Sequence, residues 1–494
     1  MNYNEETLHR KIPYVYRSMR QFTLIFSLVG LFMLESCQTQ EAVRPNILFI
    51  FADDQCFNTI HELGNPEVIT PTLDELARQG TVFTTAYNMG GWHGAICVAS
   101  RTMLNTGRFL WRANALENQL DTLAARGELW SQEMEKLGYE TYFTGKWHVN
   151  IDPPVIFHHV GSVRAGMPNQ VPEGYNRPQS EDDWNWTPWD TTFGGFWKGG
   201  VHWSEVVANE TMDFLENAST SEDPFFMYIA FNAPHDPRQS PKEYVDMYPT
   251  DEINMPANFL PEYPYKNEMG CSNRLRDEML APFPRTEYSV KVNRQEYYAI
   301  ISHMDTQIGR ILEKLEETGM AENSYIFFSA DHGLSVGQHG LLGKQNMYDH
   351  SLRPPMIIVG PDIPRGKKKD MAVYLQDIMP TVIEYAGGEV PHYVEFNSLK
   401  SFIEGVNNQT NYPEVYGAYM DLQRMIRIDD YKLIVYPYAG VKRLFNLAMD
   451  PEEMNDLALL PEQQDRLDSM FEKLIDLQVV MGDTLNLMNF QFVR

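Results

Sequence analysis

Polar residues that could carry out chemistry recur directly after predicted strands. Asp53 and Asp54 follow the continuous apolar run 46–52, and Asp331 and His332 follow a later run of the same kind. Continuous apolar runs are typical of strands buried on both faces, and open α/β sheets place their sites beyond the carboxyl ends of such strands. Because adjacent carboxylates repel each other unless a cation neutralises them, we favour a metal site over solvated strand ends. Hard oxygen ligands suit calcium or magnesium.

Two further strand signals are followed by basic side chains. Lys146 and His148 come after the signal at 140–143, and His235 comes after the one at 225–231. Each of these residues alone could be a surface charge or a hydrogen-bonded polar side chain. The carboxyl ends of parallel strands meet at one edge of a sheet, so independent segments of the chain are expected to converge on one site.

A cysteine is the third candidate for chemistry. Cys97 lies at the predicted start of a helix, with Arg101 one turn further on. The helix dipole favours an anion at this end, and a nearby cation favours a thiolate. The pattern indicates an activated thiol or an anion-binding site, although the spacing equally allows a buried structural cysteine before an amphipathic helix.

The segment around Cys97 resembles the signature of the formylglycine-dependent (type I) sulfatases. In that family, Cys-x-Pro/Ala-Ser-Arg is the recognition sequence for oxidation of the cysteine, and residues 97–101 match it with Ala99 as the permitted variant. Other segments match in the family's order, so the resemblance spans roughly residues 44–460. These segments are Asp53-Asp54, Gly145-Lys146-Trp147-His148, Ala233-Pro234-His235, Ser329-Ala330-Asp331-His332-Gly333, the stretch from Gly340 to Lys344 and, in the tail, Leu444-Phe-Asn-Leu with Asp450-Pro-Glu.

The resemblance implies a sulfuric ester hydrolase whose nucleophile is formylglycine made from Cys97. A hydroxyl of the hydrated aldehyde would attack sulfur, while Arg101, Lys146 and Lys344 stabilise charge on the sulfuryl oxygens. The resemblance further implies a divalent cation, calcium in preference to magnesium. Its implied ligands are Asp53, Asp54, Cys97, Asp331 and His332.

Two proton transfers complete the implied mechanism. His235 with Lys344 would protonate the leaving alcohol. His148 would deprotonate the second hydroxyl, which expels sulfate and restores the aldehyde. Two alternatives remain open: a formylglycine-dependent phosphodiesterase or phosphonate monoester hydrolase, and a non-catalytic glycan-binding lipoprotein.

The order of predicted elements indicates an α/β fold. Strand signals alternate with helices, including an amphipathic helix over 294–316, which is typical of a large, mostly parallel sheet flanked by helices. Short strands without long helices follow in the tail and predict a small antiparallel sheet, closed by a helix over 461–479. We therefore expect a catalytic domain over 45–395 and a subdomain over 396–494, in agreement with the alkaline-phosphatase-like fold that the resemblance implies.

The N-terminus is predicted to direct export. Residues 1–36 have the pattern of a signal peptide, with Met19 as an alternative start, and the apolar run 22–34 is too short to cross a bilayer. The signal ends at a lipobox-like sequence, so we expect a lipid on Cys37, a tether over 37–44, and a lipid-anchored protein of the outer membrane, in the periplasm or at the cell surface. A plain secretory signal is the alternative.

Net charge limits the possible binding partners of the protein, and cysteine content limits its possible disulfides. The chain has 40 basic and 67 acidic residues and a net charge of −27, which argues against a nucleic-acid partner. A sulfated substrate must then be attracted by local cations or a metal. Cys56 and Cys271 predict either a disulfide or two buried free thiols, because pairing cannot be read from sequence.

An aromatic-rich segment over 184–203 suggests the substrate class. It is too polar and glycine-rich for a core helix and reads as a long loop. Aromatic faces stack on sugars, so we predict a sulfated oligo- or polysaccharide as substrate, with some of the rings packing the loop itself. A formylglycine-generating maturase is the second expected partner. The candidate substrate residues are Trp184, Trp186, Trp189 and Trp197.

Overall fold

The computed structural model describes residues 44–165, 172–175, 177–183, 186–193 and 197–493. Residues 45–494 form one compact unit. The predicted signal peptide, the predicted lipid on Cys37 and the candidate Trp184 lie outside the described residues. In the described part of the chain, no helix has the length and apolarity needed to cross a membrane.

An eight-stranded mixed sheet forms the centre of this unit, in the order β12-β2-β11-β10-β1-β9-β5-β6. The neighbours β10, β1, β9 and β5 are all parallel to one another. Strand β11 runs antiparallel to both β10 and β2, so the expected mostly parallel sheet is confirmed with one reversed strand. The strands are β1 Asn46–Asp53, β2 Thr81–Phe83, β5 Glu140–Lys146, β6 His159–Arg164, β9 Phe225–Pro234, β10 Ser324–Ala330, β11 Met356–Val359 and β12 Lys367–Lys369.

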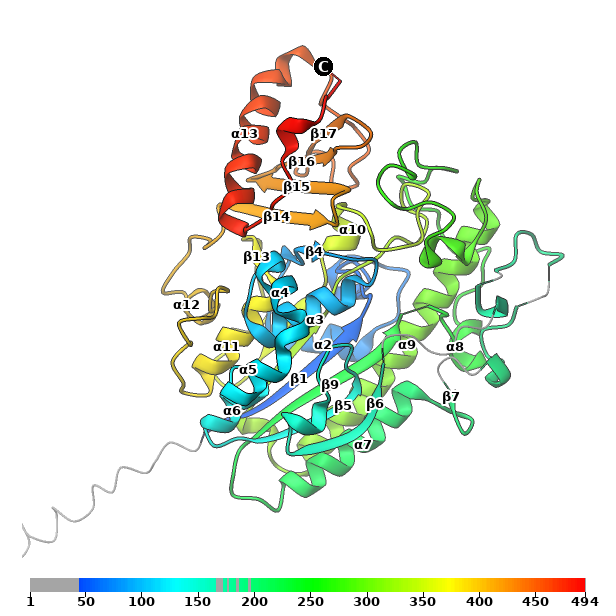
Figure 1. The fold of residues 1–494 in the computed structure, drawn as a ribbon. Coiled ribbons are helices and arrows are strands. Elements are labelled where there is room, and N and C mark those ends of the chain that lie inside the picture. Colours follow the sequence, from blue (N-terminus) through cyan, green and yellow to red (C-terminus); the bar gives the residue numbers. More distant parts are fainter. Residues whose placement is uncertain (1–43, 166–171, 176, 184–185, 194–196, 494) are drawn as a thin grey trace, which may run out of the picture. The chain divides into compact units, whose positions relative to one another are not determined.

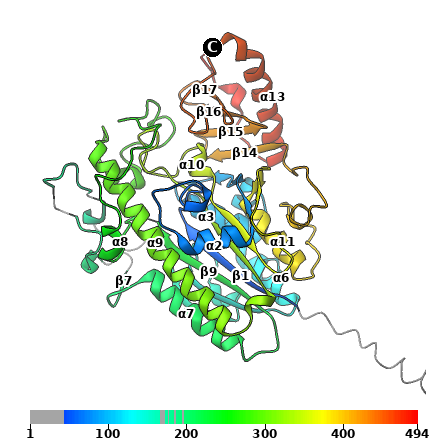
Figure 2. The ribbon, with the colours of Figure 1, turned by 180° about the vertical axis from the view of Figure 1, so that it is seen from behind.

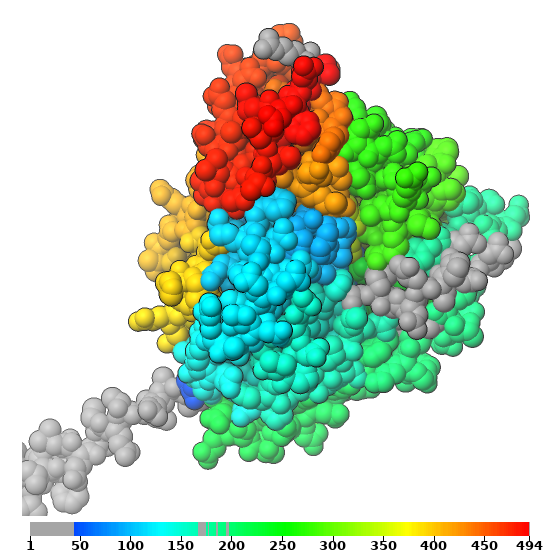
Figure 3. Space-filling model, in the orientation of Figure 1, coloured from blue at the N-terminus to red at the C-terminus, as the bar shows by residue number. Residues whose placement is uncertain are grey.

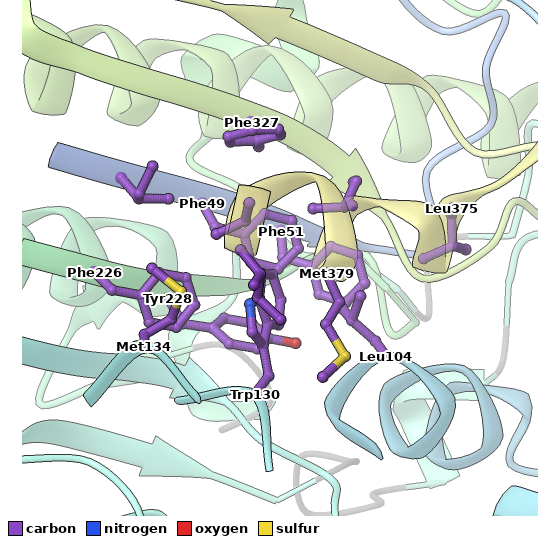
Figure 4. Packing of buried hydrophobic residues seen from close by; sticks show 14 of the residues in the cluster. Phe49, Phe51, Leu104, Trp130, Met134, Phe226, Tyr228, Phe327, Leu375 and Met379 are labelled. Carbon is purple, nitrogen blue, oxygen red and sulfur yellow. The ribbon is translucent and has the colours of Figure 1, made fainter. Parts of the chain in front are cut away.

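Helices cover both faces of this sheet, as the two opposite views in Figures 1 and 2 show. Because side chains alternate along a strand, β1 sends Leu48 and Ile50 to one face and Phe49 and Phe51 to the other. The first face packs against α2 Pro71–Gln79, α7 Trp203–Ala218 and α9 Glu287–Glu317. The second face packs against α3 Ile96–Thr106, α6 Trp130–Lys136 and α11 Ile378–Tyr385, where Trp130 lies among the aromatic rings shown in Figure 4.

The tail forms the predicted antiparallel sheet and closing helix. Its strands are β14 Glu414–Tyr419, β15 Gln423–Ile428, β16 Tyr431–Tyr436 and β17 Val441–Asn446, and the helix is α13 Gln464–Met481. In the space-filling view of Figure 3, α13 (orange-red) lies directly against the cyan segment that contains α4 (Leu110–Leu116), and there Arg112 Nη1 donates to the Val480 carbonyl at 3.1 Å. The boundary between 395 and 396 stays a prediction.

A fifth strand in the tail sheet comes from the segment just before Cys97. Strand β4 (Gly90–Gly91) pairs in parallel with β14. A Cβ atom on Gly90 would lie 2.0 Å from the Ala418 carbonyl oxygen, so this pairing requires glycine. The tail sheet is thereby hydrogen-bonded to the chain that leads into α3, and it helps to place the start of that helix.

Candidate active site

The carboxyl ends of β10, β1, β9 and β5 bring the predicted residues together. Because these strands are parallel neighbours, the residues that follow them lie along one edge of the sheet. The stretch after β10 supplies the last member of this cluster, Lys344, whose Nζ atom donates to Asp54 Oδ1. The side chains in this cluster are almost fully buried. They are those of Asp53, Asp54, Cys97, Arg101, Lys146, His235, Asp331, His332 and Lys344.

An acidic cluster at this edge fits a divalent cation. Ligand atoms of Asp53, Cys97, Asp331 and His332 all lie within 4.8 Å of one another, as do those of Asp53, Asp54 and His235. Among the described residues, Asp53 Oδ1 and His332 Nε2 have no hydrogen-bond partner, although His332 Nε2 lies 3.2 Å from Asp54 Oδ1. Burial, followed by the charge of Asp331, raises the pKa of Asp53 well above its usual range. A bound cation would satisfy these two atoms and relieve the repulsion, and the oxygen-rich donor set suits calcium or magnesium.

Three buried cations surround the carboxylates. Lys146 Nζ donates to Asp53 Oδ2, and Lys344 Nζ donates to both oxygens of Asp54 at 2.9 and 2.8 Å. Arg101 Nε donates to Asp331 Oδ2 at 3.0 Å. Burial favours the neutral amine of Lys344, but the nearby charges of Asp54, Cys97, Asp277 and Asp53 together outweigh it and hold the lysine pKa well above its usual range.

Cys97 lies at the start of α3, beside an imidazole. Its Sγ atom is 3.1 Å from His148 Nδ1, and the backbone of His148 adopts a left-handed conformation with φ 55°. Burial raises the pKa of a thiol, but Lys146, His148 and Lys344 together lower that of Cys97 well below its usual value. The thiolate is therefore favoured, which supports an activated cysteine over a purely structural one.

A cavity of about 130 Å³ opens onto Cys97. His148, His235 and Lys344 line it, whereas Arg101 and Lys146 have fully buried side chains and are not among the residues that line it. His148 also lines a second, larger cavity of about 450 Å³. The remaining walls of the first cavity were not predicted from the sequence. They are Gly94, Ala95, Leu275, Arg276, Asp277 and Gln345.

His235 is held beside the acidic cluster in its neutral form. Its Nε2 atom lies 3.5 Å from Asp54 Oδ2, and its Nδ1 atom lies 2.9 Å from the Asp236 carbonyl oxygen. Burial, with the nearby charges of Lys344 and Lys146, lowers the pKa of His235 well below its usual range.

Tyr297 supports the acidic loop, which is the segment 53–56 at the end of β1. Its position on the buried face of a helix indicated only a core residue. The Tyr297 hydroxyl donates to the Asp54 carbonyl at 2.7 Å and accepts from the Cys56 amide at 2.9 Å. Asp54 has a left-handed backbone with φ 69°, an uncommon conformation for a residue with a side chain. These two hydrogen bonds hold the loop in that conformation. Helical periodicity identifies the buried face of α9 but carries no information about such a partner.

The predicted stacking role of Trp186 is wrong. Its ring is only 4% exposed and lies between the Phe193 ring, at 4.8 Å, and the Arg177 guanidinium, at 4.1 Å, while its indole N–H donates to Glu296. Both faces are occupied, so the residue packs the loop. The charged Arg177 and Glu296 are buried together, and the ring shields them from water.

Two other candidate rings lie away from the Cys97 cavity. Trp189 packs against a small hydrophobic cluster that includes Tyr297 and Tyr298, with Lys242 Nζ 5.2 Å from its ring centre. Trp197 packs edge to face against His202 at 5.2 Å. Among the described residues, the walls of the cavity include neither ring. Their role in substrate binding stays a prediction.

Among the described residues, Cys56 and Cys271 are free thiols, so of the two predicted alternatives the disulfide is wrong. Cys56 Sγ donates to the Leu334 carbonyl at 3.0 Å, and Cys271 Sγ donates to the Gln345 carbonyl at 3.1 Å. Both thiols are buried, where they act as small apolar groups with a weak donor.

Comparison with known proteins identifies families and relatives whose sequences are similar to this chain. Residues 45–388 match the sulfatase family, and residues 337–480 match the family described as N-sulphoglucosamine sulphohydrolase, C-terminal. An arylsulfatase of Clostridium perfringens is 29% identical over 470 residues, with 88% of this chain and 94% of the relative covered. An N-acetylglucosamine-6-O-sulfatase of Bacteroides thetaiotaomicron is 26% identical over 511 residues, with coverage of 88% and 87%.

Solved structures share the fold. One, of a protein in complex with its substrate D-glucosamine-2-N,6-O-disulfate, has a TM-score of 0.70 and 21% identity, with 89% of this chain and 99% of the other covered. A phosphonate monoester hydrolase from Silicibacter pomeroyi has a TM-score of 0.69 and 20% identity, with coverage of 90% and 96%.

Proposed function

This chain belongs to the sulfatase family and is a sulfuric ester hydrolase, and we propose that it removes sulfate from a sulfated carbohydrate. The observation that carries the proposal is the position of Cys97. Its thiol lies at a cavity that His148, His235 and Lys344 line, directly beside a buried cluster of carboxylates. Because the chain's net charge of −27 repels an anionic ester at long range, Lys344 in this wall, together with a divalent cation on the carboxylates, would attract the ester locally.

The proposed nucleophile is formylglycine, made from Cys97 by a maturase. A hydroxyl of its hydrated form attacks sulfur, and Lys344 in the cavity wall stabilises the charge on the sulfuryl oxygens. Lys146 and Arg101, which do not line the cavity, hold Asp53 and Asp331 in place. A divalent cation held by the predicted ligands, calcium in preference to magnesium, would supply further charge stabilisation to the ester.

Two histidines are placed for proton transfer. His148, whose Nδ1 atom lies 3.1 Å from Cys97 Sγ, removes a proton from the side chain at position 97. Lys344, which is held in its protonated form, and the neutral His235 both contact Asp54 and line the cavity, so together they are positioned to pass a proton from Lys344 to the alcohol that leaves. The acid and base therefore act at different points of the same cavity.

Carbohydrate is the proposed substrate class. Two relatives are described as an N-acetylglucosamine-6-O-sulfatase and an ulvan-active sulfatase. The larger cavity beyond His148 offers space for a part of the substrate that extends beyond the ester. We further propose an exported protein, anchored to the outer membrane by a lipid on Cys37, that meets sulfated oligo- or polysaccharides in the periplasm or at the cell surface.

A second candidate activity is phosphonate or phosphodiester hydrolysis. The similarity in fold to a phosphonate monoester hydrolase favours it as the competing possibility. A comparison of kcat/KM for a sulfate ester and for the phosphonate ester of the same alcohol separates the two. A preference for the phosphonate would contradict the proposal.

The first test is peptide mass spectrometry on the fragment that contains Cys97, after expression with a formylglycine-generating system. Conversion of the thiol to the aldehyde lowers the mass by about 18 Da, and hydration restores that mass. We expect this change, together with turnover of N-acetylglucosamine 6-sulfate or of fragments of ulvan, and no turnover by Cys97→Ala. An unmodified thiol in a host with proven machinery would refute the mechanism and favour a binding protein.

A further inference from the structure

One wall of the Cys97 cavity contains a guanidinium that the mechanism above does not use. Arg276 is the first residue of the 3-10 turn η6 (Arg276–Leu280), in the connection between β9 and α9. It lines the cavity together with Cys97, His235 and Lys344, and its side chain remains 28% exposed. The group is therefore held in the wall and is still accessible from the cavity.

One buried carboxylate binds this guanidinium closely, and a second lies near it beyond hydrogen-bond distance. Arg276 Nη2 lies 2.6 Å from Asp277 Oδ1, and Nε lies 3.6 Å from Asp236 Oδ2. The carboxylates are fixed in turn, because Tyr175 donates to Asp236 at 2.9 Å and Gln345 donates to Asp277 at 2.8 Å. A guanidinium held in this way loses little conformational entropy when it binds a ligand.

The position of Arg276 assigns it to the alcohol part of the substrate. Asp236 directly follows His235, and Gln345, the partner of Asp277, directly follows Lys344. Arg276 therefore lies near Asp236 and, through Asp277, is linked to Gln345, so it is placed beside the two residues proposed to protonate the leaving alcohol. Lys146, in contrast, does not line the cavity and bonds the acidic cluster.

The charges around Arg276 indicate which group it binds. Asp236 and Asp277 already balance its positive charge, so a second anionic group on the substrate would meet two carboxylates nearby. Guanidinium N–H groups remain directional donors even when their charge is compensated, and they suit a neutral oxygen. We propose that Arg276 binds a hydroxyl or ring oxygen of the leaving sugar and so selects sulfated sugars over aryl sulfates. This inference rests on the proposed carbohydrate function.

The test compares two kinds of substrate in matched variants. The kcat/KM values for N-acetylglucosamine 6-sulfate, galactose 6-sulfate and 4-nitrophenyl sulfate are measured for the unchanged enzyme, Arg276→Met and Arg276→Lys, all matured at Cys97. Arg274→Met, at an exposed neighbouring residue, is the control and should behave like the unchanged enzyme. We expect Arg276→Met to lower the ratio of sugar to aryl kcat/KM by roughly 10- to 100-fold, the effect of one charged hydrogen bond. Arg276→Lys, which keeps the charge, should lie in between.

The outcomes separate this inference from the broader proposal. An equal loss on sugar and aryl sulfates in Arg276→Met, or no loss on either, would overturn the role of Arg276 alone. Turnover of the aryl sulfate but of no sulfated sugar by the unchanged enzyme would overturn both proposals. If Arg276→Met lowers the melting temperature or if the aryl ester is not a substrate, inhibition decides the question. The variant must then weaken inhibition by free N-acetylglucosamine but not by inorganic sulfate, and the reverse pattern would refute the inference.

Discussion

Substitution of Tyr297 by phenylalanine tests how the acidic loop is held. The change removes one hydroxyl from a side chain that is 1% exposed, and the ring still fills its place in the core. It deletes the hydrogen bonds to the Asp54 carbonyl and from the Cys56 amide. A buried backbone group without a partner costs about 1–3 kcal/mol, and two such groups are left, so we expect the free energy of unfolding to fall by about 2–6 kcal/mol.

The same substitution should also impair turnover. Asp54 contacts Lys344, His332 and His235, and its left-handed backbone is held in part by Tyr297. Loss of an outer hydrogen bond to a metal ligand typically weakens activity or metal affinity by about 10- to 100-fold. We therefore expect a lower kcat at limiting calcium, with partial recovery when calcium is raised.

Urea unfolding followed by fluorescence, together with kcat at several calcium concentrations, measures both effects. Tyr438→Phe is the matched control, because the Tyr438 side chain is 53% exposed and its hydroxyl donates to Asp421 at the surface. That control should change the unfolding free energy by less than about 0.5 kcal/mol. If Tyr297→Phe is as harmless as the control in both measurements, the support assigned to Tyr297 is refuted.

Three further predictions concern the metal, the aromatic loop and pH. Exhaustive chelation should abolish turnover, and addition of calcium should restore it. The free energy of unfolding should be lower by about 3 kcal/mol than that of the protein with calcium at 100 times its Kd. Full activity after chelation would contradict a metal site. Trp186→Ala should lower the free energy of unfolding by about 3–5 kcal/mol, and Trp189→Ala should lower it less. A stable Trp186→Ala protein that selectively loses turnover of sulfated sugars would instead support a stacking role for Trp186. Burial raises the pKa of Asp377 to about 7, so the folded state retains a proton that the unfolded state releases, and stability should fall as pH rises from about 4 to 7. Asp377→Asn should make that slope shallower by up to about 1.4 kcal/mol per pH unit in urea titrations, and an unchanged slope would show that the carboxyl is ionised throughout.

Local patterns in the sequence were sufficient to predict the main elements. The continuous apolar run of β1 identifies a strand buried on both faces, and the 3.6-residue periodicity of α9 identifies its core-facing side. The candidate site was predictable for the same reason, because polar residues after such strands must meet at one edge of a parallel sheet. Asp53, Lys146 and Asp331 are brought together in this way.

Other features depend on contacts between segments far apart in the chain, and only the tertiary structure decided them. The pairing of Gly90 with Ala418 joins the tail sheet to the start of α3, although a two-residue strand has no periodicity to reveal it. Trp186 and Arg276 both lie in polar segments without a regular pattern, and their local sequence does not distinguish a packed ring from a free one or a cavity wall from a surface. Packing buried the ring between Phe193 and Arg177, and it placed Arg276 beside Cys97. Residue type and spacing determine which chemistry is available, whereas long-range packing determines which side chains can reach the substrate.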